Sequence, residues 1–335
     1  MATLWDDMLD EFRALGGTAE NVCLKEGPFG RGLFPCDPSK PVKLHAPESL
    51  LVETQYISFD RDESFRWHAK APIGARERAF LEAYQRDFSW GVNRGDTEAL
   101  LKMLADASPE LRALLSTPFN IDLWLGGPSQ ANVRERYFGT RYITYKGRGV
   151  LMPVVELVNH GHTNVVFDRE DGIGIAGNFD GEILVRYRLT DALEMFSNWG
   201  FASTDQPFAL SLEVGFEIDG GEIVIERGDV SIDPKRRPFY PDVRLEGGRI
   251  VLSYLMLGHK NYPRLAKANF YHIMRNAGRS DAEEIFDRIA HINKTQFLKL
   301  IAVSEQDAPA TGKLVRTVAR TQLEALSCAV GTRQL

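Results

Sequence analysis

An apolar segment ends in two polar side chains in the stretch MPVVELVNH, residues 152–160. The stretch places an amide, Asn159, and an imidazole, His160, at the end of a buried run. Such side chains either satisfy buried backbone groups or hold a ligand, and the stretch alone leaves both interpretations open. His160 and His162 form an HxH pair, but a metal site needs further ligands and the nearest acids show no ligand pattern. We therefore expect no metal here.

A glycine-rich turn leads into a strand much earlier in the chain, in the stretch GPFGRGLFP, residues 27–35. Glycines at such a turn let backbone groups approach a ligand closely, although a plain hairpin turn explains the pattern equally well. The stretch is not a nucleotide-binding fingerprint, because the glycines open a strand rather than a helix and no GKS or GKT follows them.

A strand ending in tyrosine follows the Asn-His segment, in the stretch DGEILVRY, residues 180–187. The Asp180-Gly181 turn predicts a hairpin whose two arms pair with each other. Tyr187 places a phenol at the strand end, and with an ordinary pKa of about 10 it is uncharged at neutral pH. Taken singly, Tyr187 is more simply interpreted as a core aromatic.

The order of these three segments resembles that of the SET-domain methyltransferases. The similarity is greatest to the branch of Rubisco large-subunit lysine methyltransferase and its actin-histidine relatives, and it extends over the whole chain. The resemblance implies an α+β fold: a SET-domain β fold of small sheets with a helical insert, followed by a C-terminal helical domain. The matching stretches are GRGLF (30–34), PESLL (47–51), Thr140-Arg141, MPVVELVNH (152–160), GEILVRY (181–187) and NWGF (198–201).

The resemblance also implies roles for individual residues. S-adenosyl-L-methionine would be the cofactor, a lysine of a non-histone protein the methyl acceptor, and Tyr187 the catalytic phenol. Glu156 and Trp199 would lie along the substrate channel. The implied cofactor-binding residues are Gly30, Arg31, Gly32, Leu33, Arg141, Asn159, His160 and Phe201.

Departures from the family's pattern leave two other functions open. The family's Asn-His-Ser or Asn-His-Thr is Asn-His-Gly here, because Gly161 follows the pair, and Arg188 and Asp191-Ala192 also differ from the usual residues after the tyrosine. One alternative is a histidine or another nitrogen as the acceptor. The other is a degenerate SET-fold protein-binding module without catalysis.

The composition is that of an ordinary soluble protein. The 335 residues include 40 Lys plus Arg against 46 Asp plus Glu, a net charge of −6. A net acidic chain has no general attraction to phosphate backbones, so we expect a protein substrate and no nucleic-acid partner. The apolar stretches are too short for a membrane span, and the acidic amphipathic helix that we expect over 1–15 is unlike a signal peptide. We therefore expect a cytoplasmic location and no membrane partner.

Cysteine usage points the same way. Cys23, Cys36 and Cys328 show no CxxC spacing and cannot form a zinc cluster, so we expect three reduced thiols.

Hydrophobic periodicity divides the chain into β and helical regions. We expect a SET domain over 1–202 with a helical insert at about 75–138, a β extension over 203–258, and a C-terminal helical domain over 259–335 that resembles the family's substrate-binding domain.

Overall fold

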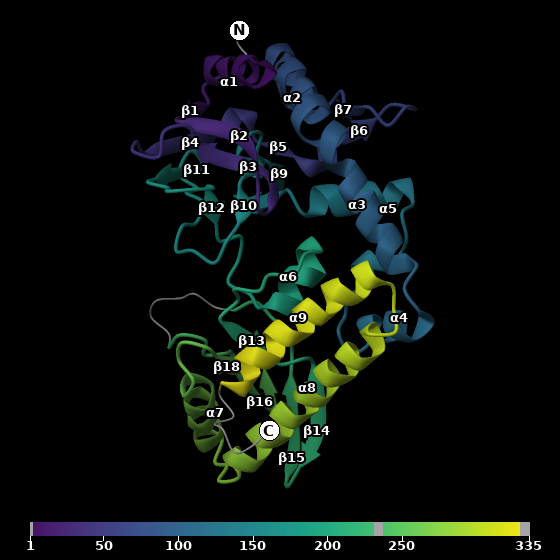
Figure 1. The fold of residues 1–335 in the computed structure, drawn as a ribbon. Coiled ribbons are helices and arrows are strands. Elements are labelled where there is room, and N and C mark those ends of the chain that lie inside the picture. Colours follow the sequence, from purple (N-terminus) through teal and green to yellow (C-terminus); the bar gives the residue numbers. More distant parts are fainter. Residues whose placement is uncertain (1–2, 231–236, 329–335) are drawn as a thin grey trace. The chain divides into compact units, whose positions relative to one another are not determined.

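The computed structural model describes residues 3–230 and 237–328, and it has the predicted α+β class, with small sheets, a helical insert and C-terminal helices (Figure 1). The chain forms two compact units. The first unit consists of Met1–Ala99 and Ser129–Arg188, and the second of Leu100–Pro128 and Leu189–Leu335. Within the described ranges, no helix is both long enough and apolar enough to cross a membrane.

Small sheets and strand pairs make up the β part of the first unit. Their strand orders are β1-β4-β11 and β5-β9-β8, with the separate pairs β2-β3, β6-β7 and β10-β12. The strands are β1 (Thr18–Glu20), β2 (Val22–Gly27), β3 (Gly30–Pro35), β4 (Val42–Pro47), β5 (Val52–Glu53), β6 (Ile57–Phe59), β7 (Phe65–Trp67), β8 (Ile143–Tyr145), β9 (Arg148–Leu151), β10 (Asn159–His160), β11 (Gly172–Gly177) and β12 (Leu184–Val185). Short 3-10 turns lie at Glu48–Leu50, Thr54–Tyr56 and Val155–Leu157.

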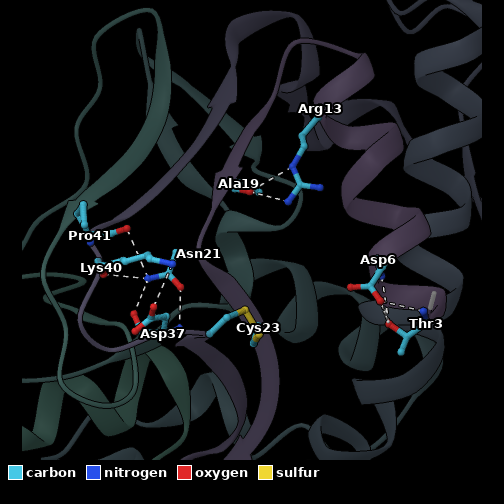
Figure 2. Close-up of a disulfide and its surroundings, with 10 residues drawn as sticks. Thr3, Asp6, Arg13, Ala19, Asn21, Cys23, Asp37, Lys40 and Pro41 are labelled. Atoms are coloured by element: carbon cyan, nitrogen blue, oxygen red, sulfur yellow. Dashed lines mark hydrogen bonds and ion pairs between the residues drawn. A yellow bond between two sulfur atoms is a disulfide. The ribbon is translucent and has the colours of Figure 1, made fainter. Parts of the chain in front are cut away.

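The N-terminal helix α1 (Leu4–Ala14) forms as predicted and is closed by a capping box. Asp6 N donates to Thr3 Oγ1 over 3.2 Å, and Thr3 N donates to Asp6 Oδ2 over 2.8 Å (Figure 2). This reciprocal pair satisfies two amides that the first helical turn would otherwise leave without partners. Phe12 on the buried face of α1 stacks on Phe80 of the insert, so the helix covers apolar surface of its own unit.

The predicted insert is helical. Its helices are α2 (Ala75–Phe88), α3 (Trp90–Ala105), α4 (Pro109–Ser116) and α5 (Gln130–Gly139), with a 3-10 turn at Asp122–Trp124. The boundary between the two units falls within α3, so that α2 and α5 belong to the first unit and α4 to the second. The chain therefore passes through both units before it completes either core.

The second unit combines a four-stranded sheet, of order β14-β15-β17-β16, with a strand pair and helices. Figure 1 shows α8 and α9 running along one another within this unit. The elements are α6 (Ala192–Trp199), β13 (Phe208–Leu210), β14 (Val214–Ile218), β15 (Gly221–Ile225), β16 (Val243–Glu246), β17 (Arg249–Leu252), β18 (Met256–His259), α7 (Leu265–Asn276), α8 (Ala282–Ser304) and α9 (Pro309–Ser327).

Strands and helices of the second unit share one apolar core. Periodicity separates a β extension over 203–258 from helices over 259–335, whereas one apolar core joins strands and helices here. Phe208 and Leu257 of the strands are buried in the same cluster as Phe270 and Phe286 of the helices. Each sheet face and each helix face buries its apolar side chains against the other, which is the usual reason for such layers to form.

The predicted hairpin at Asp180-Gly181 is wrong. The strand before this turn, β11, pairs antiparallel with β4, and the strand after it, β12, pairs parallel with β10. A turn signal indicates where the chain reverses but not which strand is the partner, and a parallel pair always joins segments separated by a long connection. This parallel pair brings the Asn-His and Tyr segments together.

The prediction of three reduced thiols is also wrong. Cys23 on β2 and Cys36 directly after β3 have their Cα atoms 5.2 Å apart and form a disulfide (Figure 2). The β2-β3 hairpin places Cys23 opposite Phe34, which brings Cys36 close to it. A cysteine count cannot reveal this pairing because it depends on strand register. Cys328 is a free, exposed thiol.

Candidate active site

Three predicted segments meet in the first unit. Ile183 N donates to Leu33 O over 2.8 Å, which joins the strand of the Tyr segment to the glycine hairpin. β12 also runs parallel to β10, with Leu184 opposite Asn159. Gly161 N continues this ladder to the Val185 carbonyl over 3.0 Å. The backbone therefore brings the glycine hairpin, the Asn-His pair and the Tyr strand side by side.

The glycine stretch is a tight hairpin whose open inner side is occupied by two polar side chains. Gly30, paired with Gly27 across the turn, has a φ of +86°, a conformation that glycine adopts without strain. A Cβ at Gly32 would lie 2.6 Å from Asn159 Nδ2 and would clash with the Glu182 carboxylate. Any larger residue at position 32 would therefore displace the Asn159 or the Glu182 side chain.

Arg31 and Leu33 fix this hairpin to the rest of the unit. Arg31 Nη2 donates to Phe88 O over 2.5 Å and to Asn93 Oδ1 over 3.1 Å, which ties the hairpin to the insert. Arg31 Nε is buried without a hydrogen-bond partner among the described residues. The Leu33 side chain is fully buried, so any contact of Leu33 with a ligand would involve its backbone.

Asn159 and His160 direct their side chains toward the other two segments. Asn159 Nδ2 donates to Glu182 Oε1 over 2.6 Å and lies 3.4 Å from Arg31 O. His160 is buried, and its Nδ1 accepts a hydrogen bond from Tyr187 N over 3.2 Å. Each side chain of the pair thus fixes a neighbouring segment, and their cofactor contacts stay a prediction.

Gly161, which departs from the family's pattern, has a packing reason in this structure. A Cβ at this position would lie 2.8 Å from the Cβ of Leu184 on the neighbouring strand. Real Cβ atoms do not approach so closely, and a larger residue would push the two strands apart. The glycine therefore permits the close parallel pairing of this segment with β12.

The Tyr187 phenol is held against a backbone carbonyl. Its hydroxyl donates to Val158 O over 2.7 Å. Burial raises the pKa of Tyr187 to about 12, and the Arg141 guanidinium opposes this shift. The carboxylates of Glu182 and Glu156 add to it, because nearby negative charge disfavours a phenolate. The phenol is therefore neutral at physiological pH, as the sequence predicts.

Glu156 lies in a buried polar cluster supplied by the insert. Its Oε1 accepts from Ser89 Oγ over 2.5 Å and from Tyr84 OH over 3.2 Å, and Ser89 Oγ also lies 3.0 Å from Tyr137 OH. Burial raises the pKa of Glu156, while the hydrogen bond from Ser89 opposes that shift. Oε2 of Glu156 is buried and has no hydrogen-bond partner among the described residues.

The turn that carries Glu156 is strained. Val154 is fully buried and has a φ of +67°. This conformation is rare for a β-branched residue and costs free energy of roughly 1–3 kcal/mol. Such positions occur most often where function requires a fixed local geometry. Here the strained residue precedes the 3-10 turn Val155–Leu157, which leads to the Val158 carbonyl that Tyr187 contacts.

Arg141 belongs to the same cluster. Its guanidinium lies 3.7 Å from the centre of the Tyr137 ring, and Nη1 donates to Thr140 Oγ1 over 3.0 Å. Its positive charge lowers the pKa values of both Tyr187 and Glu156 against the larger effect of burial. The structure thus places Arg141, Glu156 and Tyr187 within electrostatic reach of one another.

The sequence interpretation missed four contributors to this site. Glu182 lies within the stretch DGEILVRY, residues 180–187, and an acidic side chain just before a buried strand was a usable signal. Ser89, Tyr84 and Tyr137 come from helices of the insert, and nothing in their local sequence connects them with Glu156.

Trp199 and Phe201 belong to the second unit. Trp199 is the last residue of α6, Gly200 ends the helix with a φ of +79°, and Phe201 follows. Both aromatic side chains are partly buried. Their roles beside the channel and the cofactor stay predictions.

Two cavities lie away from these residues. One of about 580 Å³ in the second unit is lined by residues that include Tyr240 and His272, and one of about 180 Å³ in the first unit is lined by residues that include Glu48 and Tyr56. None of the predicted site residues lines either cavity. A buried carboxylate oxygen without a hydrogen-bond partner is uncommon in native proteins and calls for an explanation. Within the described ranges no group of three or more His, Cys, Asp or Glu is placed to hold a metal ion.

Comparisons with known proteins give one partial sequence relative and similar solved structures, and no family model matches. An uncharacterized protein of Aquifex aeolicus is 26% identical over 108 residues, which are 31% of this chain and 88% of that protein. The chain is similar in structure to the SET domain of LSMT bound to lysine and AdoHcy, with a TM-score of 0.48, 12% identity, and 98% of this chain and 91% of that one covered. It is also similar to Rubisco LSMT bound to sinefungin and monomethyllysine, with a TM-score of 0.45, 12% identity, and 98% and 90% covered. Identities and TM-scores this low assign no activity to the chain.

Proposed function

We propose that this chain is an S-adenosyl-L-methionine-dependent protein-lysine N-methyltransferase that acts on a non-histone protein. The observation that carries the proposal is the Tyr187 hydroxyl, which is neutral and held against the Val158 carbonyl beside the Asn-His segment. The order of the three motifs along the sequence supports the same activity. Backbone hydrogen bonds also bring these three motifs together in the fold.

The residues present fit the cofactor. The hairpin backbone from Gly30 to Leu33 would hold it, together with Asn159 and His160, and the cradle at Gly32 is one that a Cβ would fill. Buried carboxylate oxygens without partners suit a ligand that carries positive charge. When bound, S-adenosyl-L-methionine supplies a methyl group on a positively charged sulfur.

Tyr187 would orient the methyl acceptor. Its hydroxyl donates its proton to Val158 O, and a phenol oxygen can also accept a hydrogen bond, here from an N–H of the incoming amine. Because the phenol is neutral, it positions the amine without acting as a strong base. Fixed dipoles that need no reorganisation are the usual source of such rate enhancement.

The acceptor has to reach the site as a neutral amine. A free lysine has a pKa of about 10.4, so only about one molecule in 10³ is neutral at pH 7. Burial among apolar groups such as Val154 and Val155 would lower that pKa, and the positive charge of Arg141 would act in the same direction.

Transfer of a labelled methyl group tests the proposal. The purified chain is incubated with S-adenosyl-L-methionine carrying a labelled methyl group and with a cell extract, and mass spectrometry identifies the modified protein and residue. We expect label on a lysine of a non-histone protein. Label on histidine would replace the acceptor class, and a chain that transfers no label and binds no cofactor would overturn the enzyme assignment.

A pair of tyrosine variants tests the role of the phenol. Tyr187→Phe should lower the transfer rate by about 10²-fold or more, with little change in cofactor affinity, because it removes one preorganised polar group. Tyr145→Phe is the matched control, since Tyr145 is a buried tyrosine of the same unit whose hydroxyl contacts Glu48. Near-normal turnover of Tyr187→Phe would remove Tyr187 from the proposed mechanism.

A cytoplasmic location stays a prediction. Disulfides are uncommon in reducing compartments, so the redox state of the Cys23–Cys36 pair in cells bears directly on it. Alkylation of free thiols in intact cells, followed by mass spectrometry, would give that state.

A further inference from the structure

Glu182 is placed by the backbone against the glycine hairpin. The next residue, Ile183, donates its amide to Leu33 O, so the start of this strand lies beside β3. A Cβ at Gly32 would clash with Glu182 Oε1, and a Cβ at Gly27 would lie 2.8 Å from Oε2. The two glycines therefore make room for the Glu182 carboxylate.

The two oxygens of this carboxylate have different surroundings. Oε1 accepts from Asn159 Nδ2 over 2.6 Å. Oε2 is buried and has no hydrogen-bond partner among the described residues. Arg31, in the same hairpin, directs its Nη2 to Phe88 O and Asn93 Oδ1, so those hydrogen bonds do not reach Glu182. A buried carboxylate oxygen without a donor is unfavourable, and the structure leaves one next to the predicted cofactor segments.

Glu182 Oε2 is a hydrogen-bond acceptor, so the group that binds it has to be a hydrogen-bond donor. A sulfonium carries positive charge but has no hydrogen to donate, whereas a primary ammonium has three N–H donors. The Arg31 carbonyl, 3.4 Å from Asn159 Nδ2, is a second acceptor beside the same amide. A carboxylate oxygen and a carbonyl oxygen around one amide are suited to an ammonium group and unsuited to an anion.

We propose that Glu182 binds the primary ammonium group of the methyl donor's amino-acid portion, with Asn159 fixing the carboxylate and Gly27 and Gly32 giving it room. The assignment rests on the proposed function, because it names the residue that would hold one end of the proposed cofactor. It makes Glu182 a binding residue rather than a residue that only stabilises the fold.

A double-mutant-type cycle tests this assignment by removing the Glu182 carboxylate and the amino group of the ligand, separately and together. The probes are S-adenosylhomocysteine and its analogue in which hydrogen replaces the amino group, each measured against the wild-type chain and Glu182→Gln by calorimetry, or by displacement where binding is weak. We expect Glu182→Gln to lose affinity for S-adenosylhomocysteine by tenfold or more, and its affinity for the deaminated analogue to stay within twofold of wild type.

Other outcomes separate the failures. Equal losses for both probes would mean that Glu182 only supports the hairpin, and no loss for either would mean that water satisfies Oε2; both results overturn the assignment. If the wild-type chain binds neither probe, the proposed function itself fails. If it binds both but Glu182→Gln shows no selective loss, only the Glu182 assignment fails.

Two controls protect this reading of the cycle. Glu53→Gln removes a partly buried carboxylate of the same unit, one that pairs with Arg148, and should leave both affinities unchanged. Glu182→Ala serves as the second variant if Glu182→Gln does not fold, with the unfolding midpoint of each variant measured alongside. The same selective loss in Glu182→Ala supports the assignment, and a non-selective loss overturns it.

Discussion

Buried carboxylates in the two units differ in how completely their oxygens are used. In the second unit, Asp191 is fully buried and both of its oxygens have donors. Oδ1 accepts from Glu194 N over 2.9 Å and from Arg227 Nη2 over 3.0 Å, while Oδ2 accepts from Leu210 N over 2.9 Å. In the first unit, Glu156 and Glu182 each leave Oε2 buried without a partner among the described residues.

This difference distinguishes the structural carboxylate of Asp191 from the carboxylate of Glu182, for which we propose a binding role. Asp191 caps α6, fixes the backbone of β13 and pairs with the partly buried Arg227 guanidinium, so each of its oxygens already has a donor. In contrast, Oε2 of Glu156 and Oε2 of Glu182 accept no hydrogen bond from the described residues, so a ligand could supply the donor. The position of Asp191-Ala192, where the sequence departs from the family's pattern, is therefore explained by local packing and does not argue against a functional site in the first unit.

The largest expected effect is on stability, and it would come from Asp191. Asp191→Ala should lower the free energy of unfolding by about 3–5 kcal/mol, because it leaves the partly buried Arg227 guanidinium and two amides without this acceptor. Denaturant titration measures this loss. Asp191→Asn keeps an acceptor at the cap and should lose less. If Asp191→Ala lowers the free energy of unfolding no more than Glu182→Ala does, the contrast between the two carboxylates is wrong.

The disulfide gives the next effect, within the hairpin that carries the glycine turn. Replacing both Cys23 and Cys36 by serine should lower the free energy of unfolding by about 3 kcal/mol, since the cross-link closes a loop of 13 residues. Thermal unfolding with and without a reductant measures it: the wild-type midpoint should fall on reduction and that of the double variant should not. Equal sensitivity of the two proteins to the reductant would contradict the pairing.

A glycine substitution sharpens the contrast at Glu182. Gly32→Ala would force the Glu182 carboxylate and the Asn159 amide away from the hairpin, at a cost of about 1–3 kcal/mol, and should weaken binding of S-adenosylhomocysteine about tenfold. Calorimetry measures the affinity. Gly139→Ala, where a Cβ meets nothing within 4 Å, is the matched control and should bind normally. Unchanged affinity in Gly32→Ala would argue against the cradle.

The smallest expected effect is a change in pH dependence at Glu156. Its pKa is raised in the folded chain above the ordinary value of 4.5, so the folded state binds more protons than the unfolded state just above that pH. The free energy of unfolding should therefore fall as pH rises through 4.5 toward the folded pKa. Glu156→Gln should lack that part of the decline, whereas Glu170→Gln, on an exposed loop, should retain it. Identical pH slopes in all three proteins would contradict the raised pKa.

Local sequence was sufficient for much of the fold. Apolar spacing predicts α1, the helices of the insert and the helical character of the C-terminal region, because helical periodicity is a property of neighbouring residues. The glycine stretch likewise predicts a turn entering a strand, and it forms the β2-β3 hairpin. The order of three motifs also pointed to Tyr187, whose hydroxyl lies beside the Asn-His segment.

Tertiary structure decided which of those segments meet. The sequence by itself determined the helices, the hairpin and the residue types from which a site could be built, since these follow from short-range steric preferences and periodicity. The parallel pairing of β10 with β12, the Cys23–Cys36 bond and the contact of Glu156 with Ser89 all join residues whose partners no local pattern specifies. Which buried carboxylate oxygens are satisfied depends on those long-range contacts, because a hydrogen bond requires its donor to be present in space and not merely in the chain.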